Sequence, residues 1–234
     1  MSRNVQRAIC FCLIIGILGS STLSYVSETA TFAQGRKKNK SSIINSEPSV
    51  TNLNWNYHMI HAIHAVSERK QAEKVKVAII DSGVNYSDDI NVYERKNFIP
   101  GEEELSVLYE DFSGHGTSVA GIIAAKDNQE GITGINSNVE LYSARVLDSK
   151  NKAPIHLVVQ AIEWAVEKKV NIINLSFTTS RDSKELRKAV ERAYDAGILL
   201  IASTANKGKA ECPAAYDCVM AVGSVDSNGN VSTF

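Results

Sequence analysis

Apolar runs and amphipathic segments alternate along most of the chain, and their spacing predicts regular secondary structure. The clearest run, residues 75–80, is apolar apart from Lys76 and rich in β-branched side chains, which is typical of a strand buried on both faces. Further strands are predicted near residues 97–99 and over residues 139–146, 170–175, 198–202 and 219–225. Helices are predicted over residues 55–69, 117–125, 155–168 and 184–196. This alternation predicts an α/β fold with a doubly wound, mostly parallel sheet flanked by helices.

The first residues of the chain have the pattern of an export signal. Arg3 and Arg7 supply positive charge, residues 8–18 are continuously apolar, and small residues follow. The apolar segment is shorter than the roughly twenty residues that a stable membrane span needs. We therefore expect a signal peptide over residues 1–33, cleaved after Ala33, with an uncleaved signal anchor as the alternative. Export would make the mature protein secreted or extracellular.

After the signal segment the chain divides into a polar linker or short pro-region, residues 34–54, and a domain over residues 55–234. With 234 residues, of which 44% are apolar, the chain can bury one sizeable core, so a single domain is expected. A net charge of −1, without a basic patch interleaved with aromatic residues, argues against nucleic acid as a partner. No other stretch is apolar enough to cross a membrane, so no stable span is expected after signal cleavage. We expect a monomer.

Two cysteines remain after signal cleavage, Cys212 and Cys218. Outside the cytoplasm their spacing favours a local disulfide, with two free buried thiols as the alternative. Three histidines, His58, His61 and His64, recur every three residues on the first predicted helix. A metal site is one interpretation, but residues three apart drift around a helix and no acidic partner is near. We expect these side chains to face solvent.

Candidate chemistry lies where the predicted strands end. Asp81 directly follows the strand over residues 75–80, at the sheet edge where ligands bind in parallel α/β folds. His115 lies between two glycines and opens a helix of small apolar residues, and Asn206 follows a third apolar strand. A carboxylate can orient an imidazole that takes a proton from a hydroxyl, and an amide can donate to the oxyanion of an acyl-transfer intermediate. Taken singly each residue is more typical of a turn or a cap, but their shared placement favours catalysis.

Over residues 55–234 the chain resembles the subtilisin-type serine proteases. The segments that carry the resemblance are Asp81-Ser82-Gly83 for the aspartate motif, GHGTSVAG at residues 114–121 for the histidine motif, residues 174–176 for the substrate-binding strand, residues 204–208 for the oxyanion asparagine and residues 220–226 for the strand after it. The resemblance implies a peptide or protein substrate. It also implies that Asp81 orients His115, that His115 is the general base and then acid, and that Asn206 donates to the oxyanion.

The resemblance places the nucleophile last in the chain, in a Gly-Thr-Ser-x-Ala-x-Pro segment, which the sequence does not contain. Ser118 lies in a partial imitation of this motif, but it is only three residues from His115 on the same segment, so we reject it. We therefore expect a product truncated before the catalytic serine, without the C-terminal part of the fold and inactive as it stands. Two functional classes follow: a secreted serine endopeptidase, truncated here, and a non-catalytic peptide-binding relic.

The resemblance also implies where a peptide would bind. The substrate-binding residues it indicates are Leu175, Ser176, Phe177 and Thr178. Lys207 lies near the expected primary pocket, and we hypothesise that it favours an acidic residue before the scissile bond; an exposed lysine with no role is the alternative. Ala205 replaces the glycine that usually precedes the asparagine, which would restrict the turn.

No cofactor is required for this chemistry, and a structural calcium ion is the one addition that the resemblance suggests. Asp89, and Asn128 in the loop over residues 127–131, match the family's calcium loop. Calcium prefers about six to eight oxygen ligands, many of them main-chain carbonyls. Because the sequence supplies only these two matches, an occupied and an empty site are equal alternatives.

Overall fold

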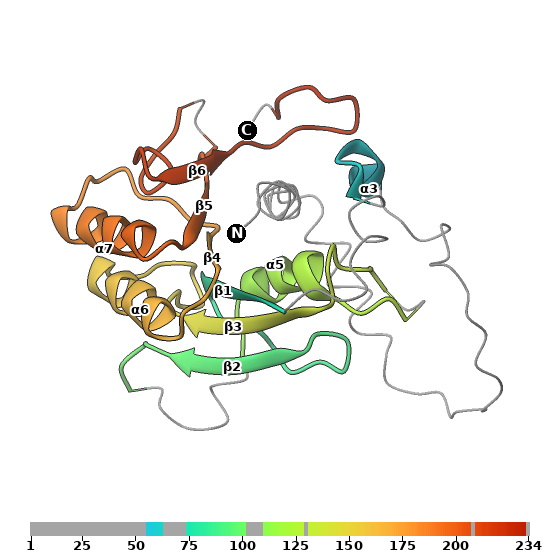
Figure 1. Ribbon diagram of the computed structural model, residues 1–234, viewed down its shortest axis with the longest axis horizontal. Coiled ribbons are helices and arrows are strands. Elements are labelled where there is room, and N and C mark those ends of the chain that lie inside the picture. The colour runs from blue at the N-terminus through green and yellow to red at the C-terminus, as the bar shows by residue number, and fades with distance from the viewer. Residues whose placement is uncertain (1–54, 63–73, 102–109, 129–130, 207–208, 233–234) are drawn as a thin grey trace.

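The computed structural model describes residues 55–62, 74–101, 110–128, 131–206 and 209–232, and Figure 1 shows their arrangement. The strands are β1 (Val75–Asp81), β2 (Val92–Asn97), β3 (Val139–Arg145), β4 (Ile172–Leu175), β5 (Leu199–Ser203) and β6 (Val219–Val222). The helices are α3 (Trp55–Met59), α5 (His115–Ala124), α6 (Ile155–Glu167) and α7 (Lys184–Asp195). The six strands form one sheet in the order β2-β3-β1-β4-β5-β6, and all these neighbours pair in parallel. The predicted doubly wound α/β fold is confirmed.

β1 lies inside the sheet because its side chains are apolar on both faces. Val77 and Ile79 belong to the apolar cluster that includes buried residues of α5. Ala78 and Ile80 point to the opposite face, into the larger cluster formed with α6 and α7. Figure 1 shows the corresponding layers, with α6 and α7 on one side of the sheet and α5 on the other. Alternate side chains of β1 therefore contribute to the apolar clusters on both faces of the sheet.

α7 shows how an amphipathic sequence is placed against the sheet. Its buried residues, spaced three and four apart, are Leu186, Ala189, Val190 and Ala193. The Ser183 hydroxyl caps the helix by accepting from the Leu186 N–H (3.3 Å). Gly197, with φ 81°, follows its end in the left-handed conformation that glycine adopts without strain. The predicted helix over residues 184–196 is therefore correct to within one residue.

The chain order of the strands brings several strand ends to one place. β3 and β4 lie on opposite sides of β1, so the connection through α6 crosses from one half of the sheet to the other. In open parallel sheets the ligand crevice forms outside the carboxyl ends of the strands at such a switch point. Asp81 ends β1 and Leu175 ends β4 at this point.

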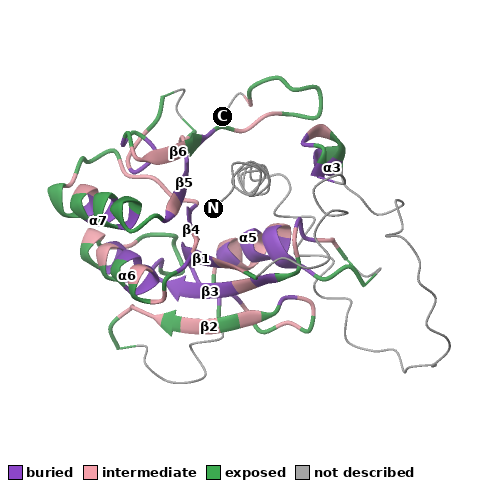
Figure 2. Cartoon of the chain, viewed as in Figure 1, coloured by how far each residue is buried: buried purple, intermediate pink, exposed green. Residues whose placement is uncertain are grey.

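Several elements differ from the predictions: β6 ends at Val222 rather than at residue 225, α5 begins at His115 rather than at residue 117, and the edge strand and α3 differ more. The edge strand is Val92–Asn97 rather than residues 97–99, because its pairing with β3 defines it and its alternating sequence carries charges. In Figure 2 this strand is intermediate and exposed, while β3 beside it is mostly buried. In α3, Trp55 is 39% exposed, and the buried residues of that helix are Asn56 and Tyr57. The helix predicted over residues 55–69 also ends earlier, at Met59.

No helix within the described ranges is long and apolar enough to cross a membrane. His58 and His61 are exposed, which agrees with the prediction that they face solvent. His64, the predicted signal peptide over residues 1–33 and the linker over residues 34–54 lie outside the described residues.

Candidate active site

Asp81 is the last residue of β1, and main-chain hydrogen bonds hold it in place. Its carbonyl oxygen accepts from the N–H groups of Val146 (2.8 Å) and Leu147 (3.1 Å), just beyond β3. Its side chain is 1% exposed. The Oδ1 atom accepts from both the N–H (2.7 Å) and the hydroxyl (3.1 Å) of Ser82. These bonds fix the position of the carboxylate through Oδ1, whereas Oδ2 is buried without a hydrogen-bond partner among the described residues.

His115 is the first residue of α5 and contacts Asp81 across the gap between helix and strand. Gly114 before it has φ 76°, and this left-handed turn directs the chain into the helix. The His115 Nδ1 and Asp81 Oδ1 atoms are 2.8 Å apart. The fold therefore brings together two residues that lie 34 positions apart in the chain.

The close approach of α5 to the loop after β1 depends on glycine at position 116. A Cβ on Gly116 would lie 2.2 Å from the carbonyl oxygen of Gly83 and 3.2 Å from the Asp81 Cβ. The Gly116 N–H also donates to the Ser82 hydroxyl (2.9 Å). Ser82 thus links the carboxylate of Asp81 to the backbone of α5. Main-chain contact, rather than side-chain reach, sets the distance between imidazole and carboxylate.

The surroundings of His115 raise its pKa above the ordinary value of 6.5. The hydrogen bond to Asp81 is the largest cause, partial burial opposes it, and the charges of Asp81 and Asp111 add to it. A carboxylate can only accept, so Nδ1 carries the shared proton and Nε2 of the neutral ring keeps its lone pair. That nitrogen can take a proton from a hydroxyl, which is the work of a general base.

Asn206 lies at the same edge of the sheet, beyond the end of β5. Because β1, β4 and β5 are parallel neighbours, their carboxyl ends share this edge. Asn206 is exposed. Ala205 before it has φ 74°, so the turn is left-handed although the residue is not glycine. The substitution of glycine by alanine at this position is therefore accommodated at a conformational cost.

A cavity of about 260 Å³ opens beside Asn206, between the ends of β5 and β6. Its polar lining residues are Ser203, Thr204, Asn206, Lys209, Ser224 and Ser232. The hydroxyl oxygens of Ser224 and Ser232 are 2.8 Å apart and share a hydrogen bond. A donor to an oxyanion must border a space that a reacting carbonyl can enter, and Asn206 borders such a space.

The segment predicted to bind substrate follows β4, and its side chains have different environments. Leu175 is buried in the core, so only its main chain is available to a peptide. The Ser176 hydroxyl accepts from the Asn174 side-chain amide (2.8 Å). Phe177 is half-buried at the margin of the larger apolar cluster. The segment is therefore anchored at its start.

Glu211 lies beside this segment and was not singled out in the sequence. Its Oε2 atom accepts from the Thr178 hydroxyl (3.3 Å). The main chains of Thr179 and Cys212 pair in both directions, at 2.8 and 3.1 Å. Only this pairing places Glu211 next to Thr178, and no local pattern could have indicated it. Lys207 lies outside the described residues.

Cys212 and Cys218 are free cysteines, so the predicted disulfide is wrong and the alternative of two free thiols holds. Both side chains pack against the larger apolar cluster. Burial is the main cause that raises the pKa of the Cys218 thiol, which favours its protonated form. Apolar packing and the pairing of Cys212 with Thr179 hold this loop without a covalent link.

The two predicted calcium ligands, Asp89 and Asn128, are neighbours in the structure. The Asn128 side-chain amide donates to Asp89 Oδ1 (2.8 Å), and the Asp89 carbonyl oxygen accepts from the Lys126 N–H (3.0 Å). A carboxylate and an amide at one place fit part of a calcium shell. Among the described residues, no group of three or more His, Cys, Asp or Glu side chains is arranged to hold a metal ion. Residues 129–130 of the same loop lie outside the described part of the chain.

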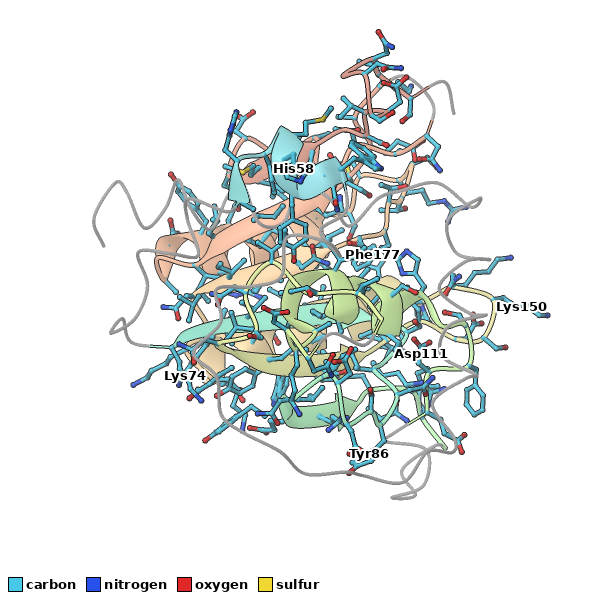
Figure 3. All side chains as sticks on the ribbon, turned by 90° about the vertical axis from the view of Figure 1, so that its right-hand side faces the viewer. His58, Lys74, Tyr86, Asp111, Lys150 and Phe177 are labelled. Carbon is cyan, nitrogen blue, oxygen red and sulfur yellow. The ribbon has the colours of Figure 1, made fainter. Side chains whose placement is uncertain are left out.

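Ser82 and Asp111 support the Asp81–His115 pair, although neither was predicted to belong to the site. Asp111 is buried just before α5, and Figure 3 labels it beside that helix. An aspartate shortly before a helix is the sequence signal of a cap, and that signal was available. The role of Ser82 depends on a contact with α5 and had no local signal.

Comparison with known proteins gives a consistent result. The model of the subtilase family matches residues 72–234. Subtilisin DY from Bacillus licheniformis is 38% identical over 183 residues, which cover 75% of this chain and 65% of that protein. Subtilisin BL from Lederbergia lenta is 35% identical over 182 residues, covering 77% of this chain and 66% of that protein. The minor extracellular protease Epr from Bacillus subtilis (strain 168) is 34% identical over 183 residues, covering 77% of this chain and 28% of that protein. The chain thus matches less than two thirds of the length of each.

Proposed function

The chain belongs to the subtilase family, and from this membership and its site geometry we propose that the protein is a serine endopeptidase. The observation that carries the proposal is the 2.8 Å distance between His115 Nδ1 and Asp81 Oδ1 at the edge of a parallel sheet. Replacing a buried charged pair by apolar residues is often neutral or stabilising, so a carboxylate–imidazole pair at a sheet edge points to a functional role.

The proposed chemistry follows from what each residue can hold. Asp81 keeps the Nδ1 proton of His115, so that Nε2 takes a proton from a nucleophilic hydroxyl as its oxygen attacks the peptide carbonyl. The Asn206 amide donates to the oxyanion that forms. His115 then returns the proton to the leaving amine, and a water molecule repeats the sequence to release the acyl group.

We assign no nucleophile within the 234 residues. The sequence contains no Gly-Thr-Ser-x-Ala-x-Pro segment, and the Ser118 hydroxyl donates to the Gly114 carbonyl oxygen (2.8 Å) in its own helix. We therefore propose that this chain alone is inactive. A non-catalytic peptide-binding protein is the second candidate function, and the same observation favours it.

Labelling with a fluorophosphonate distinguishes the two functions, because it needs an activated hydroxyl. The protein isolated from the cells that produce it would be compared with the 234-residue chain, using quenched-fluorescent peptides to detect cleavage. For an endopeptidase we expect the isolated protein to be labelled and to cleave, and the variant His115→Ala to lose at least about 10⁴-fold in kcat. Peptide binding without labelling or cleavage would support the non-catalytic alternative.

We propose secretion from the N-terminal signal pattern, and the printed name of one relative, a minor extracellular protease, is in keeping with it. Sequencing the N-terminus of the protein recovered from culture medium tests this proposal. A first residue close to Gln34 supports signal cleavage, whereas an intact Met1 in the membrane fraction supports the anchor. We also propose a monomer, which sedimentation of the same preparation tests.

The preference of the site for the residue before the scissile bond depends on two opposite charges. We propose that Lys207 favours an acidic residue before the scissile bond. Glu211, next to Thr178, places a carboxylate beside the predicted substrate-binding segment, residues 175–178. Matched peptides that differ only in Glu or Lys before the cut would be assayed with Lys207→Ala and Glu211→Ala. Loss of the preference for Glu in Lys207→Ala supports the proposal, and equal cleavage of both peptides by the wild type contradicts it.

We propose a structural calcium site at Asp89 and Asn128, in which the Asn128 amide turns from its hydrogen bond with Asp89 so that its oxygen and the Asp89 carboxylate contact the ion. Calcium there would tie the loop after α5 to the segment before β2. Thermal unfolding with calcium or with a chelator measures its occupancy, and Asp89→Asn is the matched variant. A melting temperature independent of calcium in the wild type would contradict this proposal.

A further inference from the structure

Asp111 lies four residues before His115, and both oxygens of its carboxylate accept hydrogen bonds from residues around His115. The residue is 6% exposed. Its Oδ1 accepts from the N–H (3.2 Å) and hydroxyl (3.3 Å) of Ser113 and from the Gly114 N–H (2.9 Å). Its Oδ2 accepts from the N–H (2.8 Å) and hydroxyl (2.7 Å) of Thr117. Donors on both sides of His115 therefore converge on one carboxylate.

These hydrogen bonds supply a helix cap that the residue at the cap position cannot make. Gly114 is the N-cap of α5 and makes no side-chain cap hydrogen bond. The Thr117 N–H, in the first turn, bonds to Asp111 instead, and a negative charge is favourable at this end of a helix. The His115 N–H donates to the Ser113 hydroxyl (3.1 Å). The main chain that carries the imidazole is thus held before and after it.

Asp111 is also connected to the loop that follows β1. Its N–H donates to Asn85 Oδ1 (2.6 Å), and the Asn85 N–H donates to the Thr117 hydroxyl (2.9 Å). Asp111, Thr117 and Asn85 therefore form a closed set of hydrogen bonds between α5 and the segment just after Asp81. Asp111 therefore contacts both α5, which carries His115, and the segment that follows Asp81.

Asp148, an aspartate in a surface turn of the same chain, differs from Asp111 in what its hydrogen bonds connect. Asp148 accepts from the N–H groups of Lys150 (2.8 Å) and Lys152 (2.9 Å), and it is exposed. Those bonds close one local turn. The bonds of Asp111 instead join two elements of the candidate site, and its side chain is buried between them.

We propose that Asp111 is a positioning residue: its bonds across the first turn of α5 hold the His115 imidazole at hydrogen-bond distance from Asp81. The inference rests on the proposed role of His115 as the base. Two carboxylates act on the imidazole, Asp81 from β1 and Asp111 from the preceding loop. Beside them, Arg145 of β3 stacks over the Phe112 ring, with 5.0 Å between guanidinium carbon and ring centroid, and Glu110 is exposed.

NMR of the 234-residue chain tests the proposal through the His115–Asp81 hydrogen bond itself. The measurements are the exchange rate of the His115 Nδ1 proton with water and the pH titration of the ring. Asp111→Asn removes charge and one acceptor oxygen, whereas Thr117→Val removes only the hydroxyl bonds and keeps the charge of Asp111. We expect both variants to raise the exchange rate roughly tenfold or more, because each releases the turn that carries His115. Asp148→Asn is the matched control and should leave both measurements unchanged.

The outcomes separate positioning from charge. Suppose that Asp111→Asn changes the titration of the His115 ring while Thr117→Val keeps the wild-type exchange rate of the Nδ1 proton. Asp111 would then act by its charge alone, and the proposal would be overturned. Wild-type behaviour in both variants would overturn it as well. If circular dichroism shows that Asp111→Asn is unfolded, Thr117→Val decides. None of these measurements depends on peptide cleavage, so a failure of the proposed peptidase function would be seen separately in the labelling experiment.

Discussion

The two halves of the candidate site are built differently. In the acid–base half, Asp81 and His115 are 2.8 Å apart, and Ser82 links the carboxylate to the backbone of α5. In the oxyanion half, Asn206 is exposed beside a cavity of about 260 Å³, after a non-glycine residue in the left-handed conformation. In the acid–base half the main chains of α5 and the loop after β1 are in direct contact, whereas the oxyanion half borders an open cavity.

This difference shows which part of the chemistry the described residues organise by themselves. Hydrogen bonds and main-chain packing pre-position the acid–base pair, so it needs little rearrangement before a proton moves. The amide of Asn206 has more freedom, so its contribution depends on what occupies the cavity. Substitutions in the first half should therefore have larger effects than matched substitutions in the second.

The largest effect is expected for alanine at position 116. The new Cβ of Gly116→Ala would lie 2.2 Å from the Gly83 carbonyl oxygen, so α5 must move away from β1. We expect a loss of about 3 kcal/mol or more in the free energy of unfolding, measured with urea. Gly223→Ala is the matched change in the oxyanion half, where the nearest atom is the Thr204 hydroxyl at 3.7 Å, and it should cost less than about 0.5 kcal/mol. Equal losses of unfolding free energy in Gly116→Ala and Gly223→Ala would contradict the predicted difference between the two halves of the site.

A smaller effect, with a characteristic pH dependence, is expected for Asp81→Asn. Because folding raises the pKa of His115 above 6.5, its protonation stabilises the native state fully below the unfolded pKa. That contribution is lost as the pH rises through the raised value. Urea midpoints from about pH 5 to about pH 9 should therefore fall more steeply in the wild type than in Asp81→Asn.

His58→Gln is the control for this experiment, because His58 is exposed and its removal should leave the wild-type curve unchanged. Parallel curves for the wild type and Asp81→Asn would show that the carboxylate does not hold the proton of His115. The acid–base half would then be no better organised than the other half.

The smallest effect is expected for Ala205→Gly in the oxyanion half. Alanine at φ 74° carries a steric cost that glycine does not, so we expect roughly 0.5–1 kcal/mol of stabilisation in the free energy of unfolding. Ala196→Gly, at the end of α7 with φ −75°, should destabilise instead. A destabilising effect at both positions would indicate that the turn before Asn206 is not strained.

Local pattern was sufficient wherever the burial of a segment leaves a periodic signal in its own sequence. The apolar run of β1 and the amphipathic helix α6 were predicted to within one residue, because burial on both faces or on one stripe leaves a direct signal. Asp81 and His115 were identified because a strand end and a glycine-flanked helix start are visible in the sequence. Those residues are the ones that the fold brings together.

Predictions failed where a contact between distant segments decides. The edge strand β2 exists because β3 pairs with it, and its own charged sequence does not indicate a strand. Cys212 and Cys218 are close enough in sequence to suggest a disulfide, but both pack against the core as free thiols. The support that Ser82 and Asp111 provide depends on α5 lying against the loop after β1.

The order of apolar and polar residues by itself determined the α/β class, the central strand and the two residues able to share a proton, because burial and strand ends are local properties of a sequence. Tertiary structure alone decided the distance between that carboxylate and imidazole, the residues that hold them there and the open space beside Asn206. The physical reason is that hydrogen bonds and steric contacts act over a few ångströms in space, whereas the groups that make them lie 34 residues apart along the chain.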